Sequence, residues 1–131
     1  MQIFNHPWIE SNPFYSVNSI DKIKKTPPNS IVLLHPLPSS LGLAKYCQSN
    51  SIPYAIRVQS IKNTIFANLL GAKYTISSKI LAKELMPIAQ NYLFDTQILA
   101  EIESDDEIEE MAKVNVDGVW YNYSSITSPN P

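Results

Sequence analysis

Short apolar runs recur along the chain roughly every 20 residues, and amphipathic stretches separate them. We expect six strands, at 14–17, 31–35, 54–58, 73–77, 97–102 and 116–121. Several of these runs are continuously apolar and rich in Ile and Val, which is typical of parallel strands buried on both faces. The spacing leaves room for one helix and two short loops between strands, so it predicts repeated βα units.

The intervening stretches predict helices whose starts are marked by serine. We expect helices at 60–70, 78–92 and 104–114, with shorter ones at 19–25 and 40–48. Ser19, Ser60 and Ser78 occupy N-cap positions. Ser104 and Glu107 have the spacing of a capping box, in which each side chain bonds the backbone of the other. Pro87 lies inside a helical pattern, where it should kink the helix or split it.

An internal echo supports the βα repeat. Residues 17–22 resemble residues 58–63, since each reads valine, amide, serine, isoleucine and then a polar pair, and 71–76 echoes 115–120. Such echoes resemble segments of (βα)₈ barrels, although any βα repeat requires them. We predict a single α/β domain over 1–131, with a mainly parallel sheet of five or six strands and helices on both faces. An open half-barrel of βα units is the alternative. Residues 1–13 are expected to be irregular, and 124–131 a loose tail.

Composition restricts the class of partner. The chain has 131 residues, 44% of them hydrophobic, which is enough for a core without disulfides or metals. The net charge is −2 and no long basic run exists, so we expect no nucleic acid as a partner. The first ten residues lack a secretory signal and no stretch has the length of a membrane span, so we expect a cytoplasmic protein without a membrane partner. The single cysteine, Cys47, is expected to be a small buried hydrophobe.

The common cofactor and metal motifs are absent. The three glycines, Gly42, Gly71 and Gly118, are too far apart for a dinucleotide fingerprint or a P-loop. His6 and His35 are widely separated, so a zinc site is not expected. The alternation is similar to that of response-regulator receivers, but no strand end offers the acceptor aspartate of that family. We therefore expect no cofactor and no metal.

Four residues at predicted strand ends form a candidate site. In parallel α/β sheets ligands bind beyond the carboxyl ends of the strands. His35, Arg57, Ser78 and Glu101 fall there, and Arg57 is the only arginine in the chain. Arg57 would supply a bidentate fork and the helix start at Ser78 free amides, while Glu101 would act as a base or orient His35. The simpler interpretation makes Ser78 a helix cap, pairs Arg57 with Glu101, and leaves His35 bonded to a loop carbonyl.

Two functions remain open from sequence. The leading one is a non-enzymatic binding or interaction module that forms a homodimer, with Trp120, Tyr121 and Tyr123 at the subunit contact. The rival is a small enzyme or sensor for an anionic, phosphate-bearing metabolite at the strand ends. A pocket at these residues would favour the rival, and a flat surface would favour the module.

Overall fold

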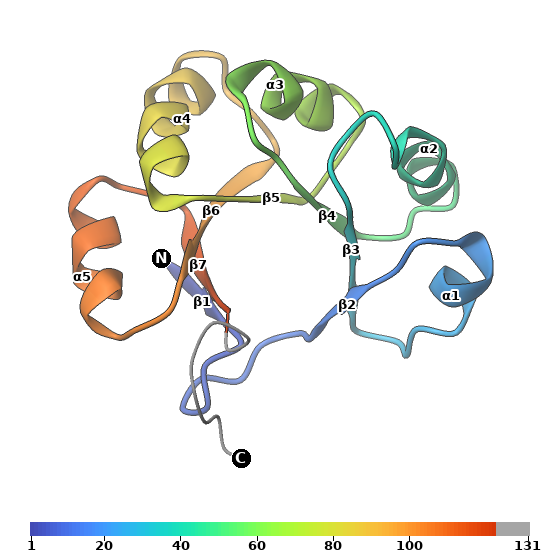
Figure 1. Cartoon of the computed structure of the whole chain (residues 1–131), viewed down its shortest axis with the longest axis horizontal. Helices are drawn as coiled ribbons and strands as arrows, with labels where there is room; N and C mark the ends of the chain where they lie inside the picture. Colours follow the sequence, from blue (N-terminus) through green and yellow to red (C-terminus); the bar gives the residue numbers. More distant parts are fainter. Residues whose placement is uncertain (123–131) are drawn as a thin grey trace.

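The computed structural model describes residues 1–122, and within them seven strands form one parallel sheet. Along the sheet the strands run in the order β1-β7-β6-β5-β4-β3-β2. From β2 to β7, neighbouring strands are successive in the chain and are joined by one helix. The exception is β1, which pairs with β7 at the other end of the chain. The sheet curls around a central axis (Figure 1). The strands are β1 (Gln2–Phe4), β2 (Phe14–Ser16), β3 (Ile31–Leu34), β4 (Tyr54–Arg57), β5 (Tyr74–Ser77), β6 (Gln97–Ile102) and β7 (Gly118–Tyr121).

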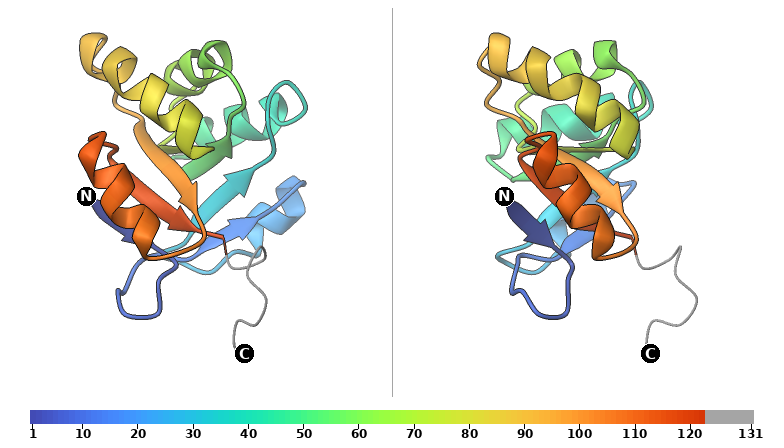
Figure 2. Two further views of the ribbon diagram at one scale, coloured as in Figure 1. Left: turned by 60° about the vertical axis from the view of Figure 1, so that its left-hand side comes forward. Right: turned by 90° about the vertical axis from the view of Figure 1, so that its left-hand side faces the viewer.

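Helices alternate with the strands and lie around the outside of the curved sheet (Figures 1 and 2). The helices of the described chain are α1 (Ile20–Lys24), α2 (Leu41–Ser49), α3 (Ile61–Leu69), α4 (Lys79–Asn91) and α5 (Asp106–Lys113). The parallel α/β fold predicted from the sequence is confirmed in its half-barrel form. The sheet has seven strands rather than five or six, and the helices cover its convex face alone.

The additional strand is β1, which corrects the expectation that residues 1–13 are irregular. It pairs in parallel with β7, so that Gln2 lies opposite Gly118 and Phe4 opposite Trp120. A Cβ atom at Gly118 would lie 2.7 Å from the Gln2 carbonyl oxygen and 2.8 Å from a Leu99 methyl carbon. Glycine at this position therefore lets β1 approach the sheet, and the chain start becomes an edge strand.

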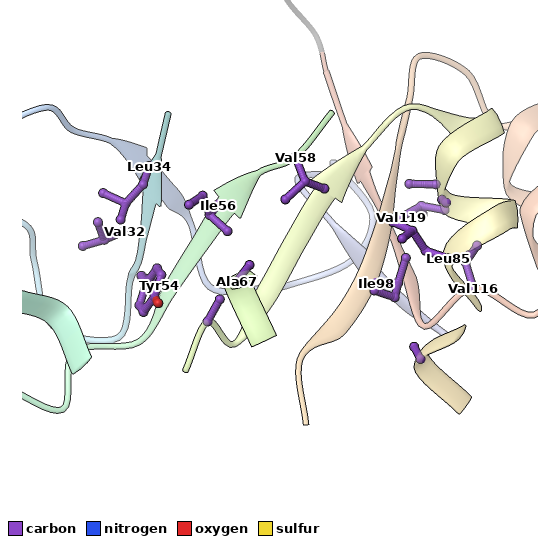
Figure 3. Packing of buried hydrophobic residues seen from close by; sticks show 14 of the residues in the cluster. Val32, Leu34, Tyr54, Ile56, Val58, Ala67, Leu85, Ile98, Val116 and Val119 are labelled. Atoms are coloured by element: carbon purple, nitrogen blue, oxygen red, sulfur yellow. The ribbon is translucent and has the colours of Figure 1, made fainter. Parts of the chain in front are cut away.

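Both faces of the sheet are apolar, which explains the continuous apolar runs. On the convex side, residues such as Val32, Leu34 and Ile56 pack beneath the helices (Figure 3). Ile31 and Leu33 alternate with them and belong to a separate inner cluster. The inner cluster also contains aromatic rings from the two edge strands, and the Phe4 and Phe14 ring centroids are 5.1 Å apart. These rings bring the edges of the half-barrel into contact without backbone pairing between β1 and β2.

Three of the four predicted serine caps are confirmed. The hydroxyls of Ser19, Ser60 and Ser78 each accept a hydrogen bond from the third residue of the helix that follows. For the capping box predicted at Ser104, only one of the two expected hydrogen bonds forms. Glu107 does accept from the Ser104 amide at 3.1 Å, but α5 begins one residue later, after Asp105, and no side chain caps it there.

Gly71 and Pro87 show how single residues shape the helices. Gly71 follows α3 with φ of +85°, the left-handed conformation that glycine adopts at lowest cost. Helix α4 continues through Pro87, so the predicted split of this helix does not occur.

Cys47 is fully buried as predicted, and burial raises the pKa of its thiol to about 11. In residues 1–122 no helix is long and apolar enough to cross a membrane.

Candidate functional site

A cavity of about 320 Å³ opens at the carboxyl ends of β4, β5 and β6. The loop after β3 and the first turn of α4 complete its walls. Its volume is at the lower end of the range for small-molecule sites. The polar residues that line it are Arg57, Gln59, Ser77, Ser78 and Glu101, beside apolar walls that include Pro36 and Leu81.

Arg57 is the cation of this cavity, and two neighbours hold its guanidinium. Its Nη1 atom donates to Oε1 of Glu101 at 3.2 Å. Its guanidinium carbon lies 5.2 Å from the centroid of the Trp120 ring, within the range of a cation–π contact. Glu101 is held in turn, because the Asn122 side-chain amide donates to its Oε2 atom. The Arg57 side chain remains one-third exposed, so a ligand in the cavity has access to it.

The opposite wall consists of the end of β5 and the start of α4. Ser78 caps α4 by accepting from the Leu81 amide at 3.2 Å. The amides of Lys79 and Ile80, in the first turn, have no carbonyl within the helix to bond. Ser77 is only 3% exposed, and its hydroxyl has no hydrogen-bond partner among the described residues. Lys79 and Ile80 are not among the residues that line the cavity, so what this wall contributes is the positive end of the α4 dipole.

The structure brings together three of the four predicted site residues. Arg57, Ser78 and Glu101 line one cavity, whereas His35 is exposed and only its neighbour Pro36 lines the wall. Glu101 bonds Arg57 and Asn122, so the predicted orientation of His35 by Glu101 is not observed in residues 1–122. The physical reason is that β3 ends at Leu34, and His35 already belongs to the proline-rich loop.

One contributor to the site was not assigned from sequence. The packing of Trp120 on Arg57 was missed, because it requires the sheet order to be known. Parallel register places Trp120 of β7 directly beside Glu101 of β6.

The aromatic residues near the end of β7 face the chain's own core. Trp120 packs against the inner cluster, and Tyr121 is only 2% exposed in the outer one. Tyr121 thus has little area left for a partner, whereas Trp120 remains partly exposed, and the predicted subunit contact stays a prediction. Tyr123, the third member of the predicted contact, lies outside the described residues.

A second polar cluster joins the loop after β1 to α5 and β7. His6 Nε2 lies 3.0 Å from Oδ1 of Asp105, and the Tyr121 hydroxyl donates to the same carboxylate. His6 Nδ1 accepts from the Trp8 amide at 3.0 Å, so in the neutral ring Nε2 carries the proton. Both ring nitrogens of His6 are engaged in hydrogen bonds, so the cluster holds the loop after β1 against α5 and β7. The His6 ring therefore has no nitrogen left to act as a base.

The α2–α3 groove, defined by Leu37, Pro38, Leu41, Phe66, Leu69 and Leu70 with Lys62 and Asn63 at its edge, is a second cavity of about 580 Å³. Its lining is almost entirely apolar, and Leu69 is 71% exposed. It has no convergent set of polar groups comparable with the cavity at the strand ends.

Comparison with known proteins assigns the chain to no family. No protein-family model matches the sequence, and no curated protein is significantly similar to it. Within residues 1–122, no three histidine, cysteine or acidic side chains are placed to hold a metal ion. The function therefore has to be argued from the cavity itself.

Proposed function

We propose that this protein binds a small anionic ligand in the cavity at the carboxyl ends of β4, β5 and β6. The observation that carries the proposal is a single cavity lined by Arg57, the only arginine of the chain, and by Ser78 at the start of α4. A planar guanidinium and a helix N-terminus are both common partners of phosphate and carboxylate groups.

The hollow favours the metabolite-binding interpretation over a flat interaction surface. The start of α4 contributes the positive end of its helix dipole, which favours a nearby negative charge by about 0.3–1 kcal/mol. The dipole and the charge of Arg57 act together only on a ligand that enters the cavity.

The proposal is for binding without a chemical step. Arg57 and Glu101 are the only titratable side chains that line the cavity in the described chain, and they are paired with each other. General acid–base catalysis requires a group that is free to exchange its proton with the ligand. A sensor or carrier fits this arrangement better than an enzyme.

Thermal denaturation with inorganic phosphate tests the proposal. A ligand that binds only the native state stabilises it by about 2.7 kcal/mol at roughly 100 times Kd, so even weak binding raises the melting temperature. We expect phosphate to raise the melting temperature of the wild type and Arg57→Lys to remove most of the increase, because lysine cannot reproduce the bidentate fork. Lys45→Gln, at an exposed lysine on α2, is the control for loss of charge elsewhere.

An unchanged melting temperature across phosphate, sulfate and small carboxylates would refute the anion site. An increase that Arg57→Lys leaves intact would place the anion elsewhere on the chain.

Homodimer formation remains a separate proposal that needs another surface. Exposed apolar residues in the α2–α3 groove, such as Phe66 and Leu69, offer area that a second chain would cover. Sedimentation velocity at micromolar concentration is the test, and a dimer is expected. A single monomeric boundary would remove the proposal without affecting the anion site.

A further inference from the structure

The cavity at the strand ends is lined by one cationic and one anionic side chain, and both lie on the concave face of the sheet. Side chains alternate along a strand, so Arg57 shares a face with Ala55 and Glu101 shares a face with Leu99. Ala55 and Leu99 both belong to the inner cluster. Ile76, on the strand between them, belongs to the same cluster and lies opposite Arg57 in register. Arg57 and Glu101 therefore meet across β5 on one side of the sheet.

Neither of these two charged groups is fully occupied by the other. The Arg57 guanidinium has five N–H donors, and within residues 1–122 it donates a single hydrogen bond, from Nη1 to Oε1 of Glu101. A carboxylate has about four lone-pair sites, of which Arg57 and the Asn122 side-chain amide occupy one each. Because the side chains of Arg57 and Glu101 are also partly exposed, a ligand in the cavity can bond both of them.

Glu101 limits how tightly a simple anion can bind at Arg57. The Nη1 atom of Arg57 is only 3.2 Å from Oε1 of Glu101, so an anionic group on the guanidinium would lie close to this carboxylate. Like charges at such a distance in a partly enclosed space disfavour binding. A ligand that also carries an ammonium group removes the repulsion, because its ammonium donates to Glu101 while its anionic group accepts from Arg57.

The same short distance determines how far apart the two charges of the ligand lie. A molecule that bonds both Arg57 and Glu101 must carry its negative and positive groups side by side. An α-amino acid has its carboxylate and its ammonium on one carbon atom, which gives this spacing. The Trp120 ring, 5.2 Å from the guanidinium carbon, holds Arg57 in place beside Glu101.

From this arrangement we infer that the ligand is an α-amino acid with a small apolar side chain, bound through its carboxylate to Arg57 and through its ammonium to Glu101. Pro36 and Leu81, which line the cavity and are only partly buried, offer apolar area to the ligand's side chain. A cavity of about 320 Å³ admits a molecule of this size. The inference rests on the proposed anion site, because the carboxylate is the anionic group that binds there.

The experiment compares three ligands that share one branched carbon skeleton. They are L-valine, isovalerate, which lacks the amino group, and isobutylamine, which lacks the carboxylate. Each is titrated against the Trp8→Phe protein, in which Trp120 is the only remaining tryptophan. Trp8 is 83% exposed, so its replacement should be tolerated. Emission from Trp120 reports on the cavity, because the guanidinium that the carboxylate would contact lies against its ring.

We expect L-valine to bind about tenfold more tightly than isovalerate, the effect of one hydrogen bond between charged groups, and more tightly than isobutylamine. Glu101→Gln, which preserves shape but removes the charge, should abolish the preference for L-valine over isovalerate. Glu103→Gln is the matched control, because this exposed carboxylate two residues along the chain is not among the residues that line the cavity, and it should keep the preference.

Equal affinities for L-valine and isovalerate, both weakened by Arg57→Lys, would overturn this inference and leave the anion site standing. Isobutylamine binding as tightly as L-valine would overturn it as well, since the carboxylate would then contribute nothing. The absence of binding by all three ligands, or binding of L-valine that Arg57→Lys leaves intact, would overturn both the inference and the anion site.

Discussion

Arg57 and Glu101 extend from the two strands that flank β5, and they meet as an ion pair with Nη1 3.2 Å from Oε1. Their side chains are one-third and one-quarter exposed, so solvent screens the attraction. Pairs of this kind contribute about 0–1 kcal/mol to stability. The pair therefore positions the guanidinium at the cavity mouth and adds little to the stability of the fold.

Arg57→Lys should accordingly lower the free energy of unfolding by less than about 1 kcal/mol. Urea denaturation of the variant without ligand measures this. A loss of several kcal/mol would show that Arg57 supports the fold, and a missing ligand response in this variant would then carry no information about the site.

Glu107 should matter more to stability than Ser104. Its Oε1 atom accepts from the Glu103 amide at 2.9 Å and from the Ser104 amide at 3.1 Å, while its Oε2 atom pairs with Lys79 at 2.7 Å. We expect Glu107→Ala to cost about 1–2 kcal/mol, in the range of lost helix caps, and Ser104→Ala less than about 0.5 kcal/mol. Equal losses in chemical denaturation would mean that the Ser104 hydroxyl caps the helix after all.

The carboxyl groups of Asp105 and Glu107, at the start of α5, should make the free energy of unfolding decrease at acid pH. The Tyr121 hydroxyl and His6 hold the pKa of Asp105 below its usual value. Burial alone would raise the pKa of Glu107, but the bonds from Lys79 and from the Glu103 amide outweigh it and lower that pKa.

A folded-state pKa below the unfolded value adds stability above the unfolded pKa, and this stability is lost as pH falls through the folded pKa. The free energy of unfolding should thus be highest above about pH 5 and fall progressively below it. Asp105→Asn and Glu107→Gln should each flatten this dependence, whereas Glu84→Gln, an exposed position on α4, should not. An unchanged slope in both α5 variants would contradict the assignment.

Gly118 should be intolerant of any side chain. The Cβ atom of Gly118→Ala would press on the Gln2 carbonyl, which belongs to the backbone of β1. We expect a loss of about 1–3 kcal/mol, as for overpacking, with increased hydrogen exchange in β1. Gly42→Ala is the matched control, because it has open space in α2 and should stabilise by about 0.5–1 kcal/mol. Similar effects of the two variants would show that β1 is not held against β7 in this way.

Much of the fold followed from local patterns in the sequence. Strands such as β3 and β5 were predicted because they bury both faces and therefore read as continuous apolar runs. The serine caps followed for a similar reason, since an N-cap acts within three residues of its own position. Strand β1 was missed because a run of three residues carries no period, and only Gly118, far along the chain, reveals its place.

The site was predictable only in part, for reasons of geometry. Arg57, Ser78 and Glu101 follow strands of one parallel sheet, so the rule for carboxyl ends places them at one edge. His35 obeys the same rule, yet it lies in a loop whose path local sequence does not determine. The contact of Trp120 with Arg57 depends on strand order, which local sequence patterns do not determine.

Backbone amide chemical shifts during a titration with inorganic phosphate test the central claim most directly. If the anion binds at the start of α4, the amide signals of Lys79 and Ile80 should move most, together with the side-chain Nε–H of Arg57. The amides of Ile20 and Asp21 are the internal control, because α1 is also capped by a serine, Ser19, but its start does not line this cavity. Shifts at both helix starts alike, or at neither, would contradict a specific anion site at the carboxyl ends of β4, β5 and β6.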